Sequence, residues 1–177
     1  MTRRALYAAT FDPVHNGHLD LMYRAAAIFD ELIVGVYDHN KPTKSIVFPA
    51  DERVDMIQQS LDSKYTNIKV MKYGGLTVEF SRQTKSQVMV RGMRVFSDFE
   101  FEFRLALANQ RLAPEIETIN FMTAQNHTFL SGTTVREIAS LGGDVSSMVP
   151  EVVAEALYRR FNGEAGDSYN RPVPLRD

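Results

Sequence analysis

Apolar positions follow two different periods along the chain, and the two periods alternate from the start to about residue 161. Short apolar runs bounded by polar or glycine-containing segments are typical of strands, and apolar residues three or four positions apart are typical of helices. The short runs predict strands at residues 5–9, 32–36, 68–71, 87–91 and 117–122. The helical spacing predicts helices at residues 19–29, 50–61, 77–84, 96–112, 131–141 and 150–161. This alternation predicts an α/β fold with an open five-stranded parallel sheet and helices on both faces.

The segment 96–112 gives two conflicting signals. Residues 99–105 alternate strictly between apolar and charged, which by period alone indicates a strand. The run continues through helix-forming residues to Leu112 and stops before Pro114, so we predict a helix. Such a helix is apolar on more than one face, and we expect it to be buried, in part against another subunit.

The carboxyl-terminal third supplies further boundaries. Thr134 and Glu137 have the spacing of a capping box at a helix start. The final helix begins after Pro150. Residues 162–177 contain glycine, serine, asparagine and proline, and we predict a flexible tail there, following a single domain over residues 1–161.

Composition and charge exclude several classes of protein. The formal net charge of −2 gives no basic surface for nucleic acid. The absence of cysteine excludes disulfides and cysteine metal sites, and it fits a reducing cytoplasm. No signal peptide and no apolar span long enough for a membrane helix is visible, so we expect a cytoplasmic protein without a membrane partner.

A group of polar residues lies between the first predicted strand and the first predicted helix. In open α/β sheets, ligands bind at the carboxyl ends of strands, and a helix start suits a phosphate. The sequence His15-Asn16-Gly17-His18 places two imidazoles three positions apart, where both can face a phosphoryl oxygen. Two alternatives stay open: a helix start with two solvated histidines, and a metal site formed by Asp12, His15 and His18.

Three other polar stretches follow predicted strands, at residues 41–44, 91–94 and 127–133. Their lysines, arginines and hydroxyls suit a polyphosphate and a second substrate that carries a phosphate. Neither a G-x-G-x-x-G nor a G-x-x-x-x-G-K-[ST] phosphate loop occurs, and no Ser/His/Asp or cysteine nucleophile arrangement is visible. A direct displacement at phosphorus needs no such nucleophile. Alternatively, Arg91 and Arg94 form ion pairs with Asp98 or Glu102.

Three motifs, TFDPVHNGH, RGMRVFSDFEFE and LSGTTVRE, occur in one order across the chain. In this combination residues 4–161 resemble the HxGH nucleotidylyltransferases and, within them, the bacterial phosphopantetheine adenylyltransferases. The resemblance implies a Rossmann-like fold and transfer of AMP from ATP to 4′-phosphopantetheine, which gives dephospho-coenzyme A and pyrophosphate. It also implies Mg²⁺ bound with ATP, a homohexamer, and feedback binding of coenzyme A.

The resemblance also implies roles for individual residues. Thr10 would bridge ATP and the acceptor phosphate, and His18 would stabilise the charge that develops on the α-phosphate. Arg91 and Lys44 would bind the acceptor phosphate, with Thr77 near the pantetheine arm. Lys44 is preferred to Lys41 because it lies four residues before Phe48. The ATP site would be formed by Thr10, Phe11, His15, His18, Gly92, Met93, Arg94, Glu102, His127, Thr128, Phe129, Leu130, Ser131, Gly132 and Thr133.

Two other functions remain open at this point. The segment Leu130-Ser131-Gly132-Thr133 departs from the usual I-S-S-[ST] of the family, which leaves another small nucleotidylyltransferase as an alternative. The RGMRVFSDFE block favours the pantetheine enzymes. A non-catalytic nucleotide-binding module is the third possibility, although such a module need not keep groups that act only in a transition state.

Overall fold

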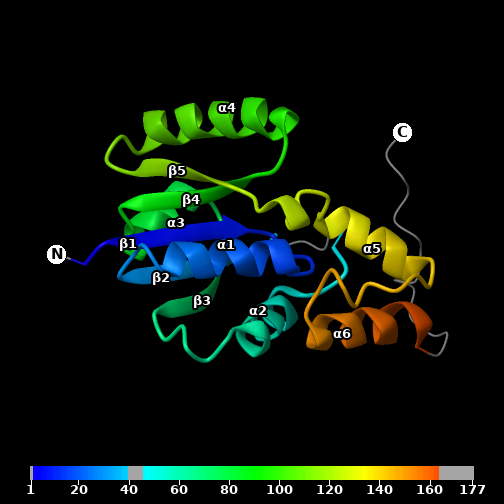
Figure 1. Ribbon diagram of the computed structural model, residues 1–177. Coiled ribbons are helices and arrows are strands. Elements are labelled where there is room, and N and C mark those ends of the chain that lie inside the picture. The colour runs from blue at the N-terminus through cyan, green and yellow to red at the C-terminus, as the bar shows by residue number, and fades with distance from the viewer. Residues whose placement is uncertain (1, 40–45, 164–177) are drawn as a thin grey trace.

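The sheet predicted from the sequence is confirmed in a computed structural model, which describes residues 2–39 and 46–163. Within these residues, five parallel strands lie in the order β3-β2-β1-β4-β5, with β1 in the centre (Figure 1). Their bounds are β1 Arg4–Ala9, β2 Glu31–Tyr37, β3 Ile68–Tyr73, β4 Val88–Met93 and β5 Glu117–Met122. The run at 32–36 is buried throughout, as an interior parallel strand should be.

In the described part of the chain, six α-helices connect and follow these strands. They are α1 Asn16–Ala26, α2 Ala50–Ser60, α3 Thr77–Gln83, α4 Phe96–Leu112, α5 Gly132–Ser140 and α6 Glu151–Asn162, with one 3₁₀ turn, η1, at Gln125–His127. The start of α1 lies before the predicted position because the His15 side chain caps it, accepting from the backbone N–H of His18. The predicted tail lies outside the described residues from position 164 on, as do Lys41 and Lys44.

Helices cover both faces of the sheet, as expected. Side chains alternate along β1, so that Ala5 and Tyr7 enter one core and Leu6 and Ala8 enter the other. The first core contains buried residues of α1, α2, α5 and α6. The second core packs α3 and the segment that follows α4, through Ala113 and Ile116, against the opposite face.

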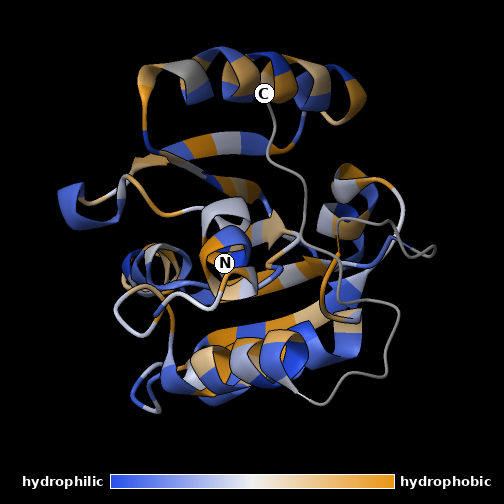
Figure 2. Cartoon of the chain, turned by 90° about the vertical axis from the view of Figure 1, so that its right-hand side faces the viewer, coloured by the Kyte–Doolittle hydropathy of each residue, from blue (hydrophilic) through white to orange (hydrophobic). Residues whose placement is uncertain are grey.

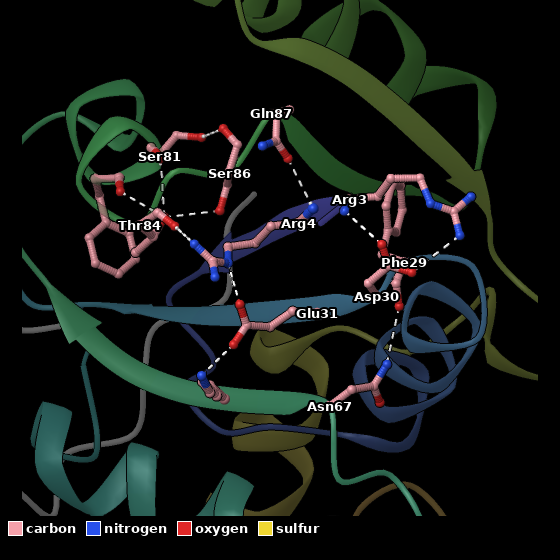
Figure 3. A network of polar contacts seen from close by, with 12 residues as sticks. Arg3, Arg4, Phe29, Asp30, Glu31, Asn67, Ser81, Thr84, Ser86 and Gln87 are labelled. Atoms are coloured by element: carbon pink, nitrogen blue, oxygen red, sulfur yellow. Dashed lines mark hydrogen bonds and ion pairs between the residues drawn. The ribbon is translucent and has the colours of Figure 1, made fainter. Parts of the chain in front are cut away.

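The side of the sheet formed by the amino ends of the strands, the amino edge, differs in chemistry from the side formed by their carboxyl ends, the carboxyl edge. At the amino edge the polar groups satisfy one another (Figure 3). The Arg4 guanidinium bonds Glu31 and the carbonyl of Thr84, and Asn67 donates to the carbonyls of Ala26 and Phe29. The carboxyl edge faces α5, to the right in Figure 1, and at β1 the chain order reverses toward β2 on one side and β4 on the other. That reversal is where open α/β sheets bind ligands.

Two predictions about helices need correction, the first only for burial within this chain, since burial of α4 against another subunit stays a prediction. The helix α4 is not buried within the chain: Phe96 is 91% exposed, and Phe99, Phe101 and Phe103 are also exposed. In Figure 2 this helix lies along one edge of the molecule and carries hydrophobic bands. The cap of α5 is Ser131, whose Oγ accepts from the N–H of Thr134, because the helix starts before the residue predicted to cap it. None of the described helices is long and apolar enough to cross a membrane.

Candidate active site

Two hollows adjoin at the carboxyl edge of the sheet. The first, the β1–β4 hollow, has a volume of about 260 Å³ and is lined by Tyr7, Ala9, His15, Gly17, His18, Leu21, Arg91, Gly92, Arg94, Thr123, His127, Leu130, Ser131 and Gly132. The second, the α5 hollow, has about 370 Å³ and is lined by Ala9, Thr10, Phe11, Asp12, His18, His39, Ile46, Gly132, Thr133 and Arg136. Ala9, His18 and Gly132 line both. A larger cavity of about 550 Å³ between α5 and α6 contains none of the predicted site residues.

His18 lies at the junction of the two hollows with its ring held on several sides. It stacks on His15, with ring centroids 3.6 Å apart, and meets the Phe11 ring edge to face at 4.9 Å. Its Nδ1 accepts a hydrogen bond from the backbone N–H of His15 at 3.3 Å, and the Nδ1 of His15 accepts from the N–H of His18. A neutral imidazole whose Nδ1 accepts carries its proton on Nε2. We therefore assign both histidines the Nε2–H tautomer, which leaves His18 a donor for a ligand.

Both imidazoles are neutral at physiological pH. Burial, together with the nearby charges of Arg94 and His127, lowers the pKa of His15 to about 4. Burial also lowers the pKa of His18 well below its usual value, helped by His15 and Arg94. A neutral His18 can donate one hydrogen bond to a phosphoryl oxygen, and a bound polyphosphate would raise its pKa.

Asp12 connects the segment after β1 to the loop before α2. The two oxygens of the Asp12 carboxylate accept from the amides of Val47 and Phe48, at 2.8 and 3.0 Å. Burial raises the pKa of Asp12, and these two hydrogen bonds and the charge of Arg136 oppose the rise. The carboxylate is thus occupied by protein groups, so its role here is to hold the loop against β1.

Arg91 and Arg94 leave β4 toward the β1–β4 hollow, and the two ion pairs considered as an alternative are both present. Arg91 forms a bidentate pair with Glu102, each contact 2.8 Å long, and donates to the carbonyl of Ala8. Arg94 bonds Asp98 and donates to the carbonyl of Leu130 at 2.8 Å. These contacts fix the directions of both guanidinium groups.

The start of α5 contributes backbone donors. Gly132 and Thr133 occupy its first two positions, and helix geometry gives their N–H groups no acceptor within the helix. A Cβ at Gly132 would lie 3.1 Å from the carbonyl oxygen of Asp12, so glycine permits the close approach of this turn to β1. Free N–H groups and the positive end of the helix dipole favour an anion here.

Most of the predicted site residues come together. The two hollows contain Thr10, Phe11, His15, His18, Arg91, Gly92, Arg94, His127, Leu130, Ser131, Gly132 and Thr133. Met93, Glu102, Thr128 and Phe129 line neither hollow, and Glu102 instead pairs with Arg91. Thr77 begins α3, bonds the hydroxyl of Tyr73 at 2.9 Å and lines neither hollow.

Sequence reasoning missed several lining residues. Tyr7, Leu21 and Thr123 carry no sequence signal of their own, because their inward direction depends on the packing of strands and helices. Arg136 could have been found, since it lies one helical turn after Gly132 within the LSGTTVRE motif. Its Nη1 donates to the carbonyl of Asp12, and its Nε is buried without a hydrogen-bond partner among the described residues.

A protein-held metal site is not visible in the described part of the chain. No group of three or more His, Cys, Asp or Glu side chains there is placed to hold an ion. Asp12, His15 and His18, considered above as metal ligands, instead bond backbone groups of the protein. Asp12 accepts from Val47 and Phe48, and the two histidines cap α1.

Comparisons with known proteins agree on one family. The family described as cytidylyltransferase-like matches residues 6–138. A phosphopantetheine adenylyltransferase of Roseiflexus sp. (strain RS-1) is 49% identical over 157 residues, covering 89% of this chain and 96% of that protein. The protein of the same description from Methylacidiphilum infernorum (isolate V4) is 43% identical over 174 residues, covering 98% and 97%.

More distant solved structures share the fold. A putative nicotinate-nucleotide adenylyltransferase from Vibrio parahaemolyticus superposes with a TM-score of 0.62 at 15% identity, over 89% of this chain and 99% of that chain. A lipopolysaccharide core biosynthesis protein from Thermoplasma volcanium GSS1 gives 0.51 at 17% identity, over 71% and 100%. At these identities the likeness concerns the fold alone.

Proposed function

The chain belongs to the phosphopantetheine adenylyltransferases, nucleotidyltransferases of coenzyme A biosynthesis. We propose that AMP is transferred in its two hollows, by direct in-line attack of the phosphate of 4′-phosphopantetheine on the α-phosphorus of ATP. The observation that carries this proposal is the position of His18, a neutral Nε2–H donor at the junction of the two hollows. A donor at that point can reach an oxygen of the α-phosphate when the nucleoside lies in one hollow and the leaving pyrophosphate in the other.

The β1–β4 hollow suits the adenosine of ATP, and the α5 hollow suits its β- and γ-phosphates. The first is bounded by Gly92, His127 and Leu130. The second offers the amide groups at the start of α5 and the cation of Arg136. ATP bound across both would bring its α-phosphate to His18 and Thr10.

The reaction itself is a displacement at phosphorus. An oxygen of the acceptor phosphate forms a bond to the α-phosphorus, and the bond to the bridging oxygen of the β-phosphate breaks, so that pyrophosphate leaves with the electron pair. The side chains would act by position and charge, which suffices for phosphoryl-type transfer. His18 would donate to the α-phosphate oxygen as negative charge grows on it, and Thr10 would orient the two phosphates.

Arg91 would bind the acceptor phosphate, with its direction set by Glu102. The bidentate pair and the bond to Ala8 hold the guanidinium at the edge of the β1–β4 hollow. Lys44 remains our candidate for a second phosphate contact, and Thr77 for the pantetheine arm.

Mg²⁺ would enter with ATP rather than in a cage of protein ligands. The described residues hold no cluster of acidic or histidine ligands, and Mg²⁺ commonly binds through substrate phosphates and water. Its chemistry would be neutralisation of the triphosphate.

We also propose that copies of this chain cover α4. Phe96, Phe99, Phe103 and Leu107 follow one another at helical spacing and are all exposed, and the phenylalanine rings are stacked 6.4 and 5.7 Å apart. Exposed apolar surface of this extent is typical of an interface. A homohexamer and feedback binding of coenzyme A, both implied by the family, and a cytoplasmic location remain part of this proposal.

Pyrophosphate release tests the function directly. The protein is incubated with Mg²⁺-ATP and 4′-phosphopantetheine, and control reactions contain CTP, glycerol 3-phosphate or nicotinamide mononucleotide. Fast release with the first pair only is the expected result. Release with a control pair would change the substrate assignment, and no release with any pair would favour a nucleotide-binding module without catalysis.

A further inference from the structure

Arg53 is a buried cation that the mechanism above does not use. It lies in α2 and is only 2% exposed. Burying a guanidinium is costly unless charges and hydrogen bonds compensate it. Burial lowers the pKa of Arg53, and the negative charges of Asp12 and Asp38 oppose that effect. Hydrogen bonds within the protein must therefore compensate the burial of Arg53.

The donors of Arg53 reach three separate segments. Nη1 donates to the carbonyl of Thr10, just after β1, and to the carbonyl of Tyr37, at the end of β2, the latter at 3.0 Å. Nε donates to the carbonyl of Phe48, just before α2, at 2.9 Å. One side chain therefore joins the ends of two neighbouring strands to the start of a helix.

Asp12 completes the same link from the other side. Its carboxylate accepts from the amides of Val47 and Phe48. Phe48 is thus held at its N–H by Asp12 and at its carbonyl by Arg53, and its ring is covered by the guanidinium of Arg160, 5.2 Å from the centroid. The segment before α2 is fixed to the segment that contains Thr10.

These anchored segments form walls of the α5 hollow. Thr10 itself lines it, and so do His39, two residues after Tyr37, and Ile46, one residue before Val47. Between Thr10 and Asp12, Phe11 has a φ of 51°, a left-handed conformation that is unfavourable for a bulky residue. Arg53 holds the carbonyl before Phe11 and Arg136 holds the carbonyl after it, so the surroundings maintain this turn.

We propose that Arg53 is a positioning residue for catalysis: by holding the carbonyls of Thr10, Tyr37 and Phe48, it fixes Thr10 and the walls of the α5 hollow against His18. It acts through Thr10 and touches no substrate. The inference rests on the proposed reaction, because Thr10 is the group whose position matters there. Small displacements of a positioning group lower turnover strongly, by up to roughly 10²-fold for about 1 Å.

The test compares Arg53→Met and Arg53→Lys with a control of similar burial. Ile57→Ala lies one turn further along α2, is fully buried, and touches the first core rather than the hollow. We measure kcat, the KM of each substrate, the thermal midpoint, and hydrogen exchange at the amides of Val47 and Phe48. All assays are run below the midpoint of the least stable variant.

Arg53→Met should lower kcat by roughly 10²-fold while each KM stays within about threefold, because placement of the reacting groups is lost but the binding surfaces remain. Arg53→Lys should recover part of the loss, since an ammonium can reach some of the three carbonyls. Ile57→Ala should lower the midpoint and leave kcat unchanged. Exchange at the two amides should accelerate in the Arg53 variants and not in the control.

If Arg53→Lys and Arg53→Met both fold and their kcat equals that of Ile57→Ala, the proposal is overturned. If neither Arg53 variant folds, Arg53→Gln carries the same test, because its amide keeps a polar donor at the buried position but cannot reach all three carbonyls; an unchanged kcat there would overturn the proposal equally. If the wild-type protein releases no pyrophosphate, the proposed function fails. In that case unchanged amide exchange in the folded Arg53 variants would separately refute the anchoring by Arg53.

Discussion

The depressed pKa of His15 makes the stability of the fold depend on pH in a predictable direction. Burial, with Arg94 and His127 nearby, lowers that pKa from 6.5 to about 4. Between pH 6.5 and about pH 4, His15 binds a proton in the unfolded chain but stays neutral in the folded chain. The stabilising contribution is therefore fully present above about pH 6.5 and is lost as the pH falls toward 4.

The size of the loss follows from the two pKa values. At pH 5 the unfolded imidazole is almost fully protonated and the folded one is mostly neutral. The resulting difference in the free energy of unfolding between pH 7 and pH 5 is about 2 kcal/mol. The variant His15→Asn should not show it, because asparagine does not titrate and is a good helix cap that can keep the acceptor for the N–H of His18.

Urea unfolding at pH 7 and pH 5, followed by circular dichroism, measures this difference. Wild type should lose about 2 kcal/mol more than His15→Asn between the two pH values. Asp12, whose raised pKa acts in the opposite direction, remains in both proteins and cancels in the comparison. His18 also remains in both, and burial, the main cause of its lowered pKa, is common to them, so only the smaller effect of His15 on His18 adds to the measured difference. Equal losses in the two proteins would show that His15 is not held neutral, and the burial argument would then be incorrect.

Three further substitutions test the site and the surface. His18→Ala should lower kcat by roughly 10²–10³ and leave the Kd of ATP within a few-fold, and unchanged turnover would remove His18 from the mechanism. Arg91→Ala should raise the KM of the phosphorylated acceptor more than that of ATP, with the exposed Arg82→Ala as control, and the reverse pattern would exchange the two binding assignments. Phe103→Glu should reduce the assembly mass measured by light scattering, whereas a monomeric wild-type protein would refute the proposed use of α4.

Periodicity was enough for the strands and for the approximate positions of most helices, because each of these elements buries one repeating face. The helix α4 was predicted against its period, from its helix-forming residues and the stop before Pro114. The errors occurred where a tertiary or quaternary factor decides. The strict alternation at 99–105 is compatible with a helix only because its apolar residues need not all be buried in the same chain, and several are exposed. Ser131 caps α5 in place of the predicted Thr134 because a side-chain hydroxyl can cap from either position, and local sequence does not decide between them.

The site was predictable where a motif fixes local geometry and unpredictable where it depends on segments far apart in sequence. His15, Gly17 and His18 come together through one helix start. The approach of Arg53 to Thr10 joins residues 43 positions apart, and that of Arg136 to Asp12 joins residues 124 positions apart. No local pattern carries information about such contacts.

Arg91 shows why an ion pair and a substrate contact were not true alternatives. A guanidinium has five N–H groups, and within the described residues the two contacts to Glu102 and the one to Ala8 use three of them. Two donors therefore remain for a phosphate, on a fork whose plane is already fixed by the partly buried pair. Glu102, expected to line the ATP site, would then influence the acceptor through Arg91. Its replacement by glutamine should raise the KM of the acceptor more than the KM of ATP. In the proposed reaction, pairing within the protein would thus orient this cation for the acceptor phosphate.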